Sequence, residues 1–219
     1  MTKELFKSNI LKKIWWIGGS PGAGKTSLAK ALGEKYNLYV YHCDEHYKQH
    51  IACSTQKEHP TIHRLAPMSE DEFWMRPVEQ QYTDAIEFYQ EEFKIMMNNI
   101  SVLLHQESSI IIEGTIVMPQ LLTELNIPKE RAIWLVPTSD FQRKQHLTRG
   151  DWVYNILSQC KNPSVALENW MQRDEIFAQN IINICIDKAL PCYIVDGSLN
   201  KLEIFKLIEQ YFLNFGFPY

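Results

Sequence analysis

The chain has 219 residues, 45% of them hydrophobic and 22% charged, which is an ordinary composition for one globular domain with a sizeable core. A formal net charge of −4 argues against a general nucleic-acid binder and against a protein drawn to anionic membranes. Five irregularly spaced cysteines favour reduced thiols over a disulfide framework. The sequence shows no signal-peptide pattern after Met1 and no run of about 18 apolar residues. We therefore expect a cytoplasmic protein that neither spans a membrane nor binds nucleic acid.

The first part of the chain predicts a strand, a helix and a second strand. The apolar run Lys13–Gly18 is typical of a buried strand. A helix is expected to follow and to reach about Lys35, where Tyr36 and Asn37 can close it. Leu38–His42 then predicts a short second strand.

The segment after the second strand is less regular. Residues 43–67 are polar and rich in histidine, which predicts an irregular loop. Ser69 and Glu72 have the spacing of a capping box, so we expect a short helix that ends before Pro77. From Val78 to about His105, apolar residues recur at spacings of three and four, which predicts one long helix.

Strands and helices alternate through the rest of the chain. Three further strands are predicted at Ser109–Glu113, Ala132–Val136 and Cys192–Val195. Helices are predicted up to Leu125, from a Ser139–Gln142 capping box to about Arg149, from Asn162–Pro163 to about Leu190, and over Lys201–Leu213. Residues 150–161 favour neither element.

Five short apolar strands joined by helical crossovers predict an α/β fold with a doubly wound parallel sheet and helices on both faces. We expect residues 1–219 to form a single domain, with an insertion at about 43–105 and a lid-like segment at about 138–162. Ligands of such sheets bind at the carboxyl ends of the strands. Asp44, Glu113, Pro137 and Asp196 all follow strand ends, so we expect them at one edge of the sheet.

Residues Gly19–Thr26 read G-S-P-G-A-G-K-T, which matches the phosphate-binding pattern G-x-x-x-x-G-K-[ST] between a predicted strand and a predicted helix. The glycines let the backbone approach an anion closely, the turned loop points N–H groups inward, and the next helix adds its positive dipole end. Lys25 is expected to reach the β- and γ-phosphates, and Thr26 to hold Mg²⁺. The predicted nucleotide-binding residues are Gly19, Ser20, Gly22, Ala23, Gly24, Lys25, Thr26 and Ser27.

Two carboxylates at predicted strand ends are candidates for the chemistry. Glu113 ends the third strand, where it can hold Mg²⁺, directly or through water, or accept a proton from an attacking hydroxyl. Asp44 follows the second strand, with Glu45 as the weaker candidate, where a carboxylate can hold or activate an acceptor hydroxyl. Both Asp44 and Glu113 are therefore predicted catalytic residues, and either can take the proton.

Charge that develops on a transferred phosphoryl group needs cations around it. Arg143, Lys144 and Arg149 lie on the predicted helix after the fourth strand, and Arg173 lies on the next long helix. We predict Arg143 and Arg149 as the catalytic arginines, provided that this segment bends over the site as a lid. Arg76 is a candidate for an anionic acceptor group or for an ordinary surface charge.

Five of the seven histidines fall between His42 and His63. His46 and His50 are four residues apart and would share a helix face, as in a zinc site. The region contains neither a C-x-x-C nor an H-E-x-x-H pattern, so we favour a polar loop on the acceptor side over structural zinc.

Taken in order, these motifs resemble the small P-loop kinases of the nucleoside- and nucleotide-kinase-like group, which includes shikimate and gluconate kinases, chloramphenicol phosphotransferase and zeta-toxin kinases. The resemblance covers most of the chain and rests on Gly19–Thr26, Asp44, Glu113–Thr115, Arg143 with Arg149, and Asp196–Ser198. It implies strand order 2-3-1-4-5, Mg·ATP as the donor, a closing lid, and a loop containing Asp196 near the adenine. The chain departs from the group in lacking an Asp-x-Asp motif after the second strand and in having Glu, not Asp, after the third.

These features favour an ATP-dependent phosphotransferase that transfers the γ-phosphoryl group of Mg·ATP to a small hydroxyl-bearing molecule. The expected cofactors are ATP and Mg²⁺, and the expected partners are a nucleoside triphosphate and a small acceptor, with the protein a monomer or homodimer. One alternative is a nucleoside or nucleotide kinase. Another is a nucleotide-binding regulatory NTPase without a small acceptor. The sequence does not decide between ATP and GTP.

Overall fold

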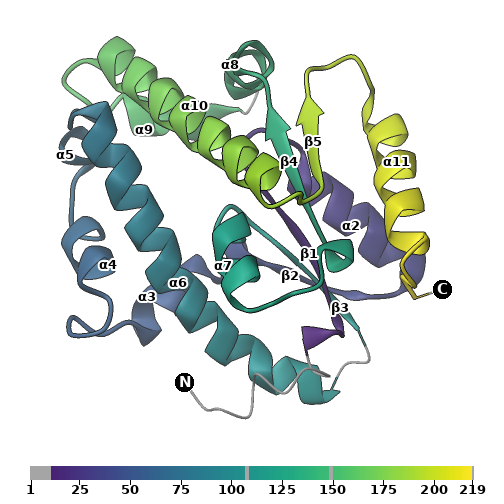
Figure 1. Cartoon of the computed structure of the whole chain (residues 1–219). Coiled ribbons are helices and arrows are strands. Elements are labelled where there is room, and N and C mark those ends of the chain that lie inside the picture. Colours follow the sequence, from purple (N-terminus) through teal and green to yellow (C-terminus); the bar gives the residue numbers. More distant parts are fainter. Residues whose placement is uncertain (1–10, 107–108, 148–149, 219) are drawn as a thin grey trace.

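The computed structural model describes residues 11–106, 109–147 and 150–218 and contains the predicted doubly wound sheet (Figure 1). Its five strands pair only in parallel and in the order β2-β3-β1-β4-β5, which confirms the predicted fold class and strand order. The strands are β1 (Ile14–Gly19), β2 (Tyr39–His42), β3 (Ile110–Glu113), β4 (Ala132–Pro137) and β5 (Cys192–Val195).

The central strand β1 is buried along its whole length because helices cover both faces of the sheet. Successive side chains of a strand point to opposite faces. Trp16 accordingly lies in one hydrophobic core cluster and Trp15 in the other. Trp134 of β4 is also buried and donates from Nε1 to the Val117 carbonyl at 2.8 Å. These tryptophans therefore build the core.

Helices cover both faces of the sheet (Figure 1). One face is covered by α2 (Lys25–Tyr36) and α11 (Lys201–Leu213), and the other by α6 (Val78–Gln106), α7 (Pro119–Glu124) and α10 (Pro163–Asp187). The predicted end of α2 is confirmed, since Asn37 is left-handed at φ 51°. The predicted start of α10 is also confirmed, because the Asn162 side chain accepts from the Val165 N–H. This helix ends at Asp187, slightly before the predicted position.

The prediction of an irregular loop over residues 43–67 is wrong. This segment forms α3 (Cys43–Cys53) and α4 (Pro60–Leu65), both packed against α6. The helix α3 buries His50, whose ring nitrogens have partners on other elements, and a local polarity pattern does not reveal such burial. The next helix, α5 (Glu70–Trp74), begins with the predicted capping box of Ser69 and Glu72.

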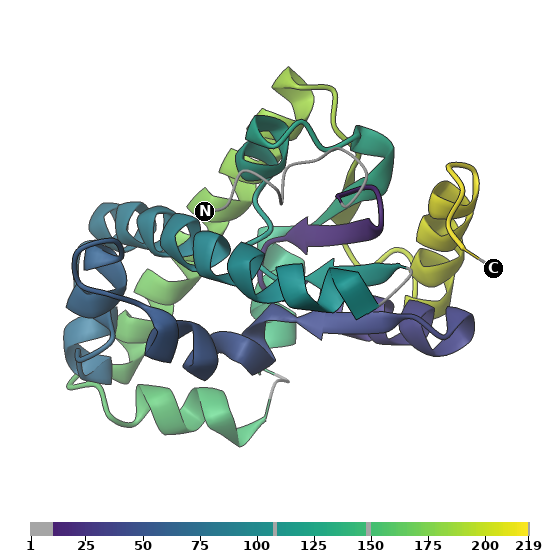
Figure 2. The ribbon, with the colours of Figure 1, turned by 90° about the horizontal axis from the view of Figure 1, so that it is seen from below.

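The segment predicted as a lid contains α8 (Ser139–Leu147) and α9 (Asp151–Leu157). The predicted capping box is wrong here, because the Phe141 N–H is capped by the Thr138 hydroxyl, while Ser139 donates to Glu175. A small core of Trp74, Val153 and Trp170 joins α5, α9 and α10. With α3 and α4, these helices extend beyond the sheet on one side (Figure 2).

A short 3-10 turn (Lys129–Arg131) leads into β4. All five cysteines are free thiols, as predicted. Within the described residues, no helix has the length and apolarity needed to cross a bilayer.

Close contact at the end of β1 generates a first prediction. Gly19 has φ +126°, and a Cβ on it would lie 1.9 Å from the Leu135 carbonyl oxygen, so the Gly19→Ala protein must move β4 or unfold. We expect Gly19→Ala to lower the free energy of unfolding by about 3 kcal/mol or more. Urea denaturation followed by circular dichroism measures the loss.

Gly216→Ala is the matched control. Gly216 also has positive φ, at +81°, but a Cβ there meets nothing within 4 Å. Its expected cost is backbone strain alone, about 1 kcal/mol. Equal losses in the two variants would contradict the close contact of β1 with β4.

Candidate functional site

The loop from Gly19 to Thr26 joins the carboxyl end of β1 to the N-terminus of α2, as predicted. Gly22 and Gly24 are left-handed, with φ 87° and 83°. Gly24 caps α2 without any side-chain hydrogen bond, so no side chain competes for the first N–H groups of the helix. The buried Ser20 hydroxyl also lacks a partner. Unsatisfied donors in a glycine-rich turn at a helix N-terminus fit a bound phosphate.

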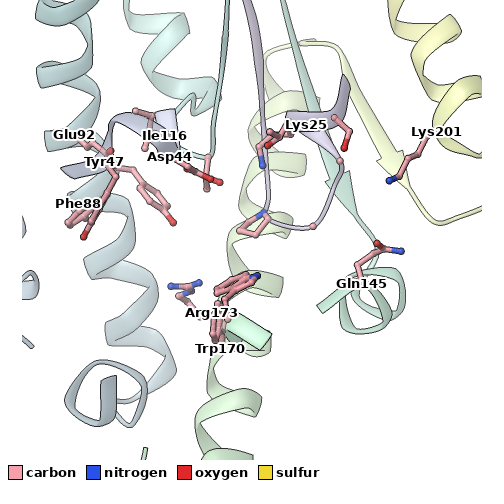
Figure 3. Close-up of a pocket in the computed structure, with 18 residues that line it drawn as sticks. Lys25, Asp44, Tyr47, Phe88, Glu92, Ile116, Gln145, Trp170, Arg173 and Lys201 are labelled. Carbon is pink, nitrogen blue, oxygen red and sulfur yellow. The ribbon is translucent and has the colours of Figure 1, made fainter. Parts of the chain in front are cut away.

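The polar side chains of the loop face a cavity of about 470 Å³. Lys25 is buried, donates from Nζ to the Ser20 carbonyl at 2.9 Å, and lines this cavity with Thr26 and Ser27. Asp44 on α3 lines the same cavity (Figure 3). The predicted base and the predicted phosphate ligands therefore share one space.

Aromatic side chains form much of the wall opposite Lys25. Tyr47 and Phe88 stack with ring centroids 6.0 Å apart, and Tyr89, Trp152 and Trp170 also line the cavity. In Figure 3, Tyr47, Phe88 and Glu92 lie on the side of Asp44, while Gln145 and Lys201 lie on the far side of the loop. We call the part lined by Asp44, Tyr47, Phe88, Tyr89 and Glu92 the acceptor end, after the role that the sequence predicts for Asp44.

A second cavity of about 660 Å³ lies on the other side of the loop. Most of its side chains are apolar, among them Leu28, Phe141, Val195, Leu199, Leu202, Ile204 and Phe205. Ala23 also lines it, whereas Asp196 does not. Asp196 accepts from both the hydroxyl and the N–H of Ser198, and these bonds lower its pKa, so it shapes the turn after β5. The two cavities meet at residues that line both: Gly22, Gly24, Ser27, Gln145 and Lys201.

Glu113 is buried at the end of β3 beside the last residue of β2. The strand register places it opposite His42, and His42 Nδ1 lies 2.8 Å from Glu113 Oε1. Glu113 lines neither of the two cavities, although Thr115 and Ile116, just beyond it, line the first. The sequence reasoning did not identify His42 as its partner.

The predicted arginines lie in different surroundings. Arg143 forms a bidentate pair with Glu168, with both N–O distances 2.9 Å, and lines neither cavity. Arg149 lies outside the described residues. Arg173, the candidate on α10, lines the first cavity and has its guanidinium 4.9 Å from the centre of the Trp74 ring. Arg76 is paired with Asp84 and lines neither cavity.

Gln142 is a connecting residue that the sequence reasoning treated only as a helix cap. Its Nε2 donates to the Pro21 carbonyl at 3.1 Å and to Asp174 Oδ2 at 3.0 Å. Asp174 in turn accepts from Arg173 Nε at 2.9 Å. Gln142 thereby links the phosphate loop to the arginine that lines the cavity.

Glu92 is a second residue that the sequence reasoning missed. Its Oε1 lies 2.8 Å from His50 Nδ1, and His50 Nε2 lies 2.8 Å from the Tyr41 hydroxyl. The Tyr41 hydroxyl can donate to Nε2, which places the imidazole proton on Nδ1, where it donates to Glu92. Burial raises the pKa of Glu92, and the charge of Asp44 adds to that rise, while the His50 bond opposes it.

The histidines are not arranged as a metal centre. His46 and His50 do lie on one helix, but His46 stacks on Tyr41 with ring centroids 4.0 Å apart. In the part of the chain that the structure describes, no group of three or more histidine, cysteine or acidic residues is placed to hold a metal ion.

A parallel sheet in the order 2-3-1-4-5, with a phosphate-type loop after its central strand, defines the fold as that of P-loop kinase-like proteins. No protein-family profile and no curated protein sequence matches the chain. Solved structures do resemble it. Shikimate kinase from Acinetobacter baumannii in complex with shikimate has a TM-score of 0.44 and 16% identity, over 92% of each chain.

Two further solved structures are similar to the same extent. Deoxyadenosine kinase from M. mycoides with bound dATP has a TM-score of 0.43 and 16% identity, over 92% of this chain and 99% of that one. An uncharacterized protein from Eubacterium ventriosum has a TM-score of 0.44 and 17% identity, over 92% of this chain and 98% of that one.

The burial of Glu92 predicts a pH dependence of stability. Because its pKa is raised in the folded protein, Glu92 contributes stability below its unfolded pKa of about 4.3, and loses it as pH rises through the folded pKa. Glu92→Gln removes this titration. The unfolding free energy of the wild type, relative to the variant, should therefore fall as pH rises from about 4 toward neutrality.

Chemical denaturation at a series of pH values measures this difference. Glu79→Gln, an exposed position on the same helix, is the control and should show no such trend. A wild type that gained stability relative to Glu92→Gln on going to neutral pH would contradict the assigned shift.

Proposed function

We propose that the protein is an ATP-dependent phosphotransferase that acts on a small hydroxyl-bearing molecule. The observation that carries this proposal is the position of Asp44 and Lys25 in one cavity, with the phosphate-type loop between this cavity and a second one. A donor and an acceptor can then meet at the loop from opposite sides. The shared cavity favours a transferase over a regulatory NTPase, which needs no acceptor space.

The second cavity is the proposed site for the base of the nucleotide. Apolar side chains of α2, α8 and α11 line it, and a flat ring buries well against such surfaces. Gly197 and Phe141 pack closely together in the lining of this cavity, since a Cβ on Gly197 would lie 2.9 Å from the Phe141 ring. The triphosphate would then extend over the loop toward Lys25.

The residues present also fit Mg²⁺. Thr26 lines the cavity, whereas Glu113 ends the adjacent strand and lines neither cavity. Thr26 is therefore the proposed direct ligand, and Glu113 is proposed to act through water. When bound, the ion would neutralise charge on the β- and γ-phosphates.

The proposed step is a direct displacement at the γ-phosphorus. The acceptor hydroxyl oxygen forms a bond to phosphorus while the bond to the β–γ bridging oxygen breaks and ADP leaves. Asp44 takes the hydroxyl proton, because it lines the acceptor end, whereas Glu113 is engaged by His42. Lys25 and the loop N–H groups hold the charge that develops on the phosphoryl oxygens.

Arg173 is the arginine that we propose for the transferred group. It lines the cavity, and Gln142 and Asp174 connect it to the loop. Residues 138–162 are proposed to close over the nucleotide as a lid, with Trp152 on the inner side, and closure would exclude water. Arg143 and Arg149 remain candidates for a closed state.

A nucleoside kinase is the second candidate function. The aromatic wall of the acceptor end favours it, because nucleobases stack on aromatic rings. Arg76, which the sequence suggested as an anion-reading residue of such an enzyme, is instead held by Asp84 outside the cavity.

Lys25→Ala tests the proposed function. We expect phosphoryl transfer to fall by about 10²–10³-fold or more, because one preorganised cation is lost from the transition state, while the circular dichroism spectrum is unchanged. Transfer from γ-labelled ATP to an acceptor library is the measurement. Lys30→Ala, an exposed position on the same helix, should keep full activity. Full turnover by Lys25→Ala would argue against the mechanism.

A comparison of three arginine variants tests which arginine is catalytic. We expect Arg173→Met to lower kcat by about 10³-fold, since a well-placed arginine contributes that much to phosphoryl transfer. Arg143→Met should lose much less, because Arg143 lines neither cavity. Arg149→Met completes the set. A different result would overturn this assignment. If Arg173→Met stays active while Arg143→Met or Arg149→Met loses about 10³-fold in kcat, the catalytic arginine is the impaired one, as the sequence predicted.

A further inference from the structure

The charges at the acceptor end limit the kind of acceptor that can bind there. Two carboxylates, Asp44 and Glu92, line this end. Three cations line the same cavity, but each has another task. Lys25 belongs to the phosphate loop, and Lys201 also lines the second cavity. Arg173 interacts electrostatically with Tyr89 of the acceptor end, but its guanidinium donates to the buried carboxylate of Asp174. The acceptor end therefore carries an excess of negative charge.

Glu92 is built as a fixed hydrogen-bond acceptor. His50 holds its Oε1, and Tyr41 holds the other side of the His50 ring, so a chain of buried hydrogen bonds fixes the carboxylate. The three residues come from α6, α3 and β2, so the packing of three separate elements holds the carboxylate in one position. Glu92 also lines the cavity, so its carboxylate is both fixed by His50 and close to the space for a ligand.

The aromatic side chains beside Glu92 also favour a positively charged ligand. Tyr47 and Phe88 stack on each other and Tyr89 meets Phe88 edge to face, with ring centroids 6.2 Å apart. Aromatic faces attract cations electrostatically, most strongly where water is displaced. A carboxylate flanked by aromatic rings is a typical receptor for an ammonium group.

We propose that the acceptor is a small hydroxyl compound that carries a protonated amine, with its ammonium group at Glu92 and its hydroxyl at Asp44. This inference rests on the proposed function and names its substrate class. The hydroxyl oxygen receives the phosphoryl group and gives its proton to Asp44, while the amine keeps its protons and is not modified. An acidic acceptor would face Asp44 and Glu92, and the cavity arginine, Arg173, is already paired with Asp174.

Matched sets of acceptors that differ in one group test the proposal. Serinol, glycerol and glycerate form one set, and glucosamine, glucose and glucuronate form another, with adenosine as the nucleoside member. Calorimetry with a non-hydrolysable ATP analogue gives affinity, and transfer from γ-labelled ATP gives kcat and KM. We expect the amines to show kcat/KM values about 10–100-fold above their neutral partners, the range of a charge-assisted hydrogen bond, with the acids lowest.

Variants at Glu92 separate recognition from folding. Glu92→Gln should raise KM for the amines about 10–100-fold and leave kcat and the ATP affinity nearly unchanged. Glu92→Asp, which keeps the charge, should recover part of the preference. Glu79→Gln, exposed on the same helix, should behave as the wild type. A melting curve for each variant confirms that it is folded.

The outcomes of this experiment distinguish the two proposals. If the protein does not bind Mg·ATP, the proposed function fails. If it binds Mg·ATP but prefers the neutral, acidic or nucleoside members, or binds no amine, the amine assignment is overturned and the phosphotransferase assignment is not. An amine preference that Glu92→Gln leaves intact also overturns the role of Glu92.

Discussion

Parallel pairing of β1 with β3 and β4 is the constraint on which the site depends. The register sets Ile17 opposite Glu113 and Gly19 opposite Leu135, so three strands end close together at one edge. No side chain fits at Gly19 against the Leu135 carbonyl. The chain turns away from the sheet directly after this glycine, and α2 begins only a few residues later. The phosphate-type loop is a consequence of this packing as much as of its own glycines.

The site is assembled from segments that are far apart in the chain, and single side chains hold them in place. Gln142 contacts Pro21, 121 positions away, and Asp174, 32 positions away. A movement of α8 would thus change the loop and the cavity arginine together. This coupling gives a physical route by which a bound phosphate can bias the position of the α8–α10 region. Preorganisation of this kind lowers the cost of ordering catalytic groups when substrates bind.

Local signals in the sequence predicted the sheet, the loop, the capping box at Ser69 and the cap at Asn162, because each depends on neighbours within a few residues. They did not predict that residues 43–67 form helices, since α3 buries the single polar residue His50 against a distant partner, Glu92, 42 positions away. Gln142 and Glu92 have no motif around them. Their roles come from contacts between residues far apart in the chain, and no local sequence pattern marks such contacts. The sequence likewise offered four candidate arginines but did not show that Arg173 lines the cavity.

The two sides of the phosphate-type loop differ in polarity and charge, and this difference limits the kind of acceptor that can bind. The second cavity, the proposed site for the base, is mostly apolar, whereas the acceptor end gathers Asp44 and Glu92 beside aromatic rings. Burial and mutual repulsion raise the pKa of Glu92, so without a ligand the charged form carries an electrostatic cost. A bound ammonium group offsets that cost, a neutral polyol leaves it, and an acid adds to it. Under the amine proposal, the charge arrangement that weakens the unliganded fold is also the one that discriminates among acceptors.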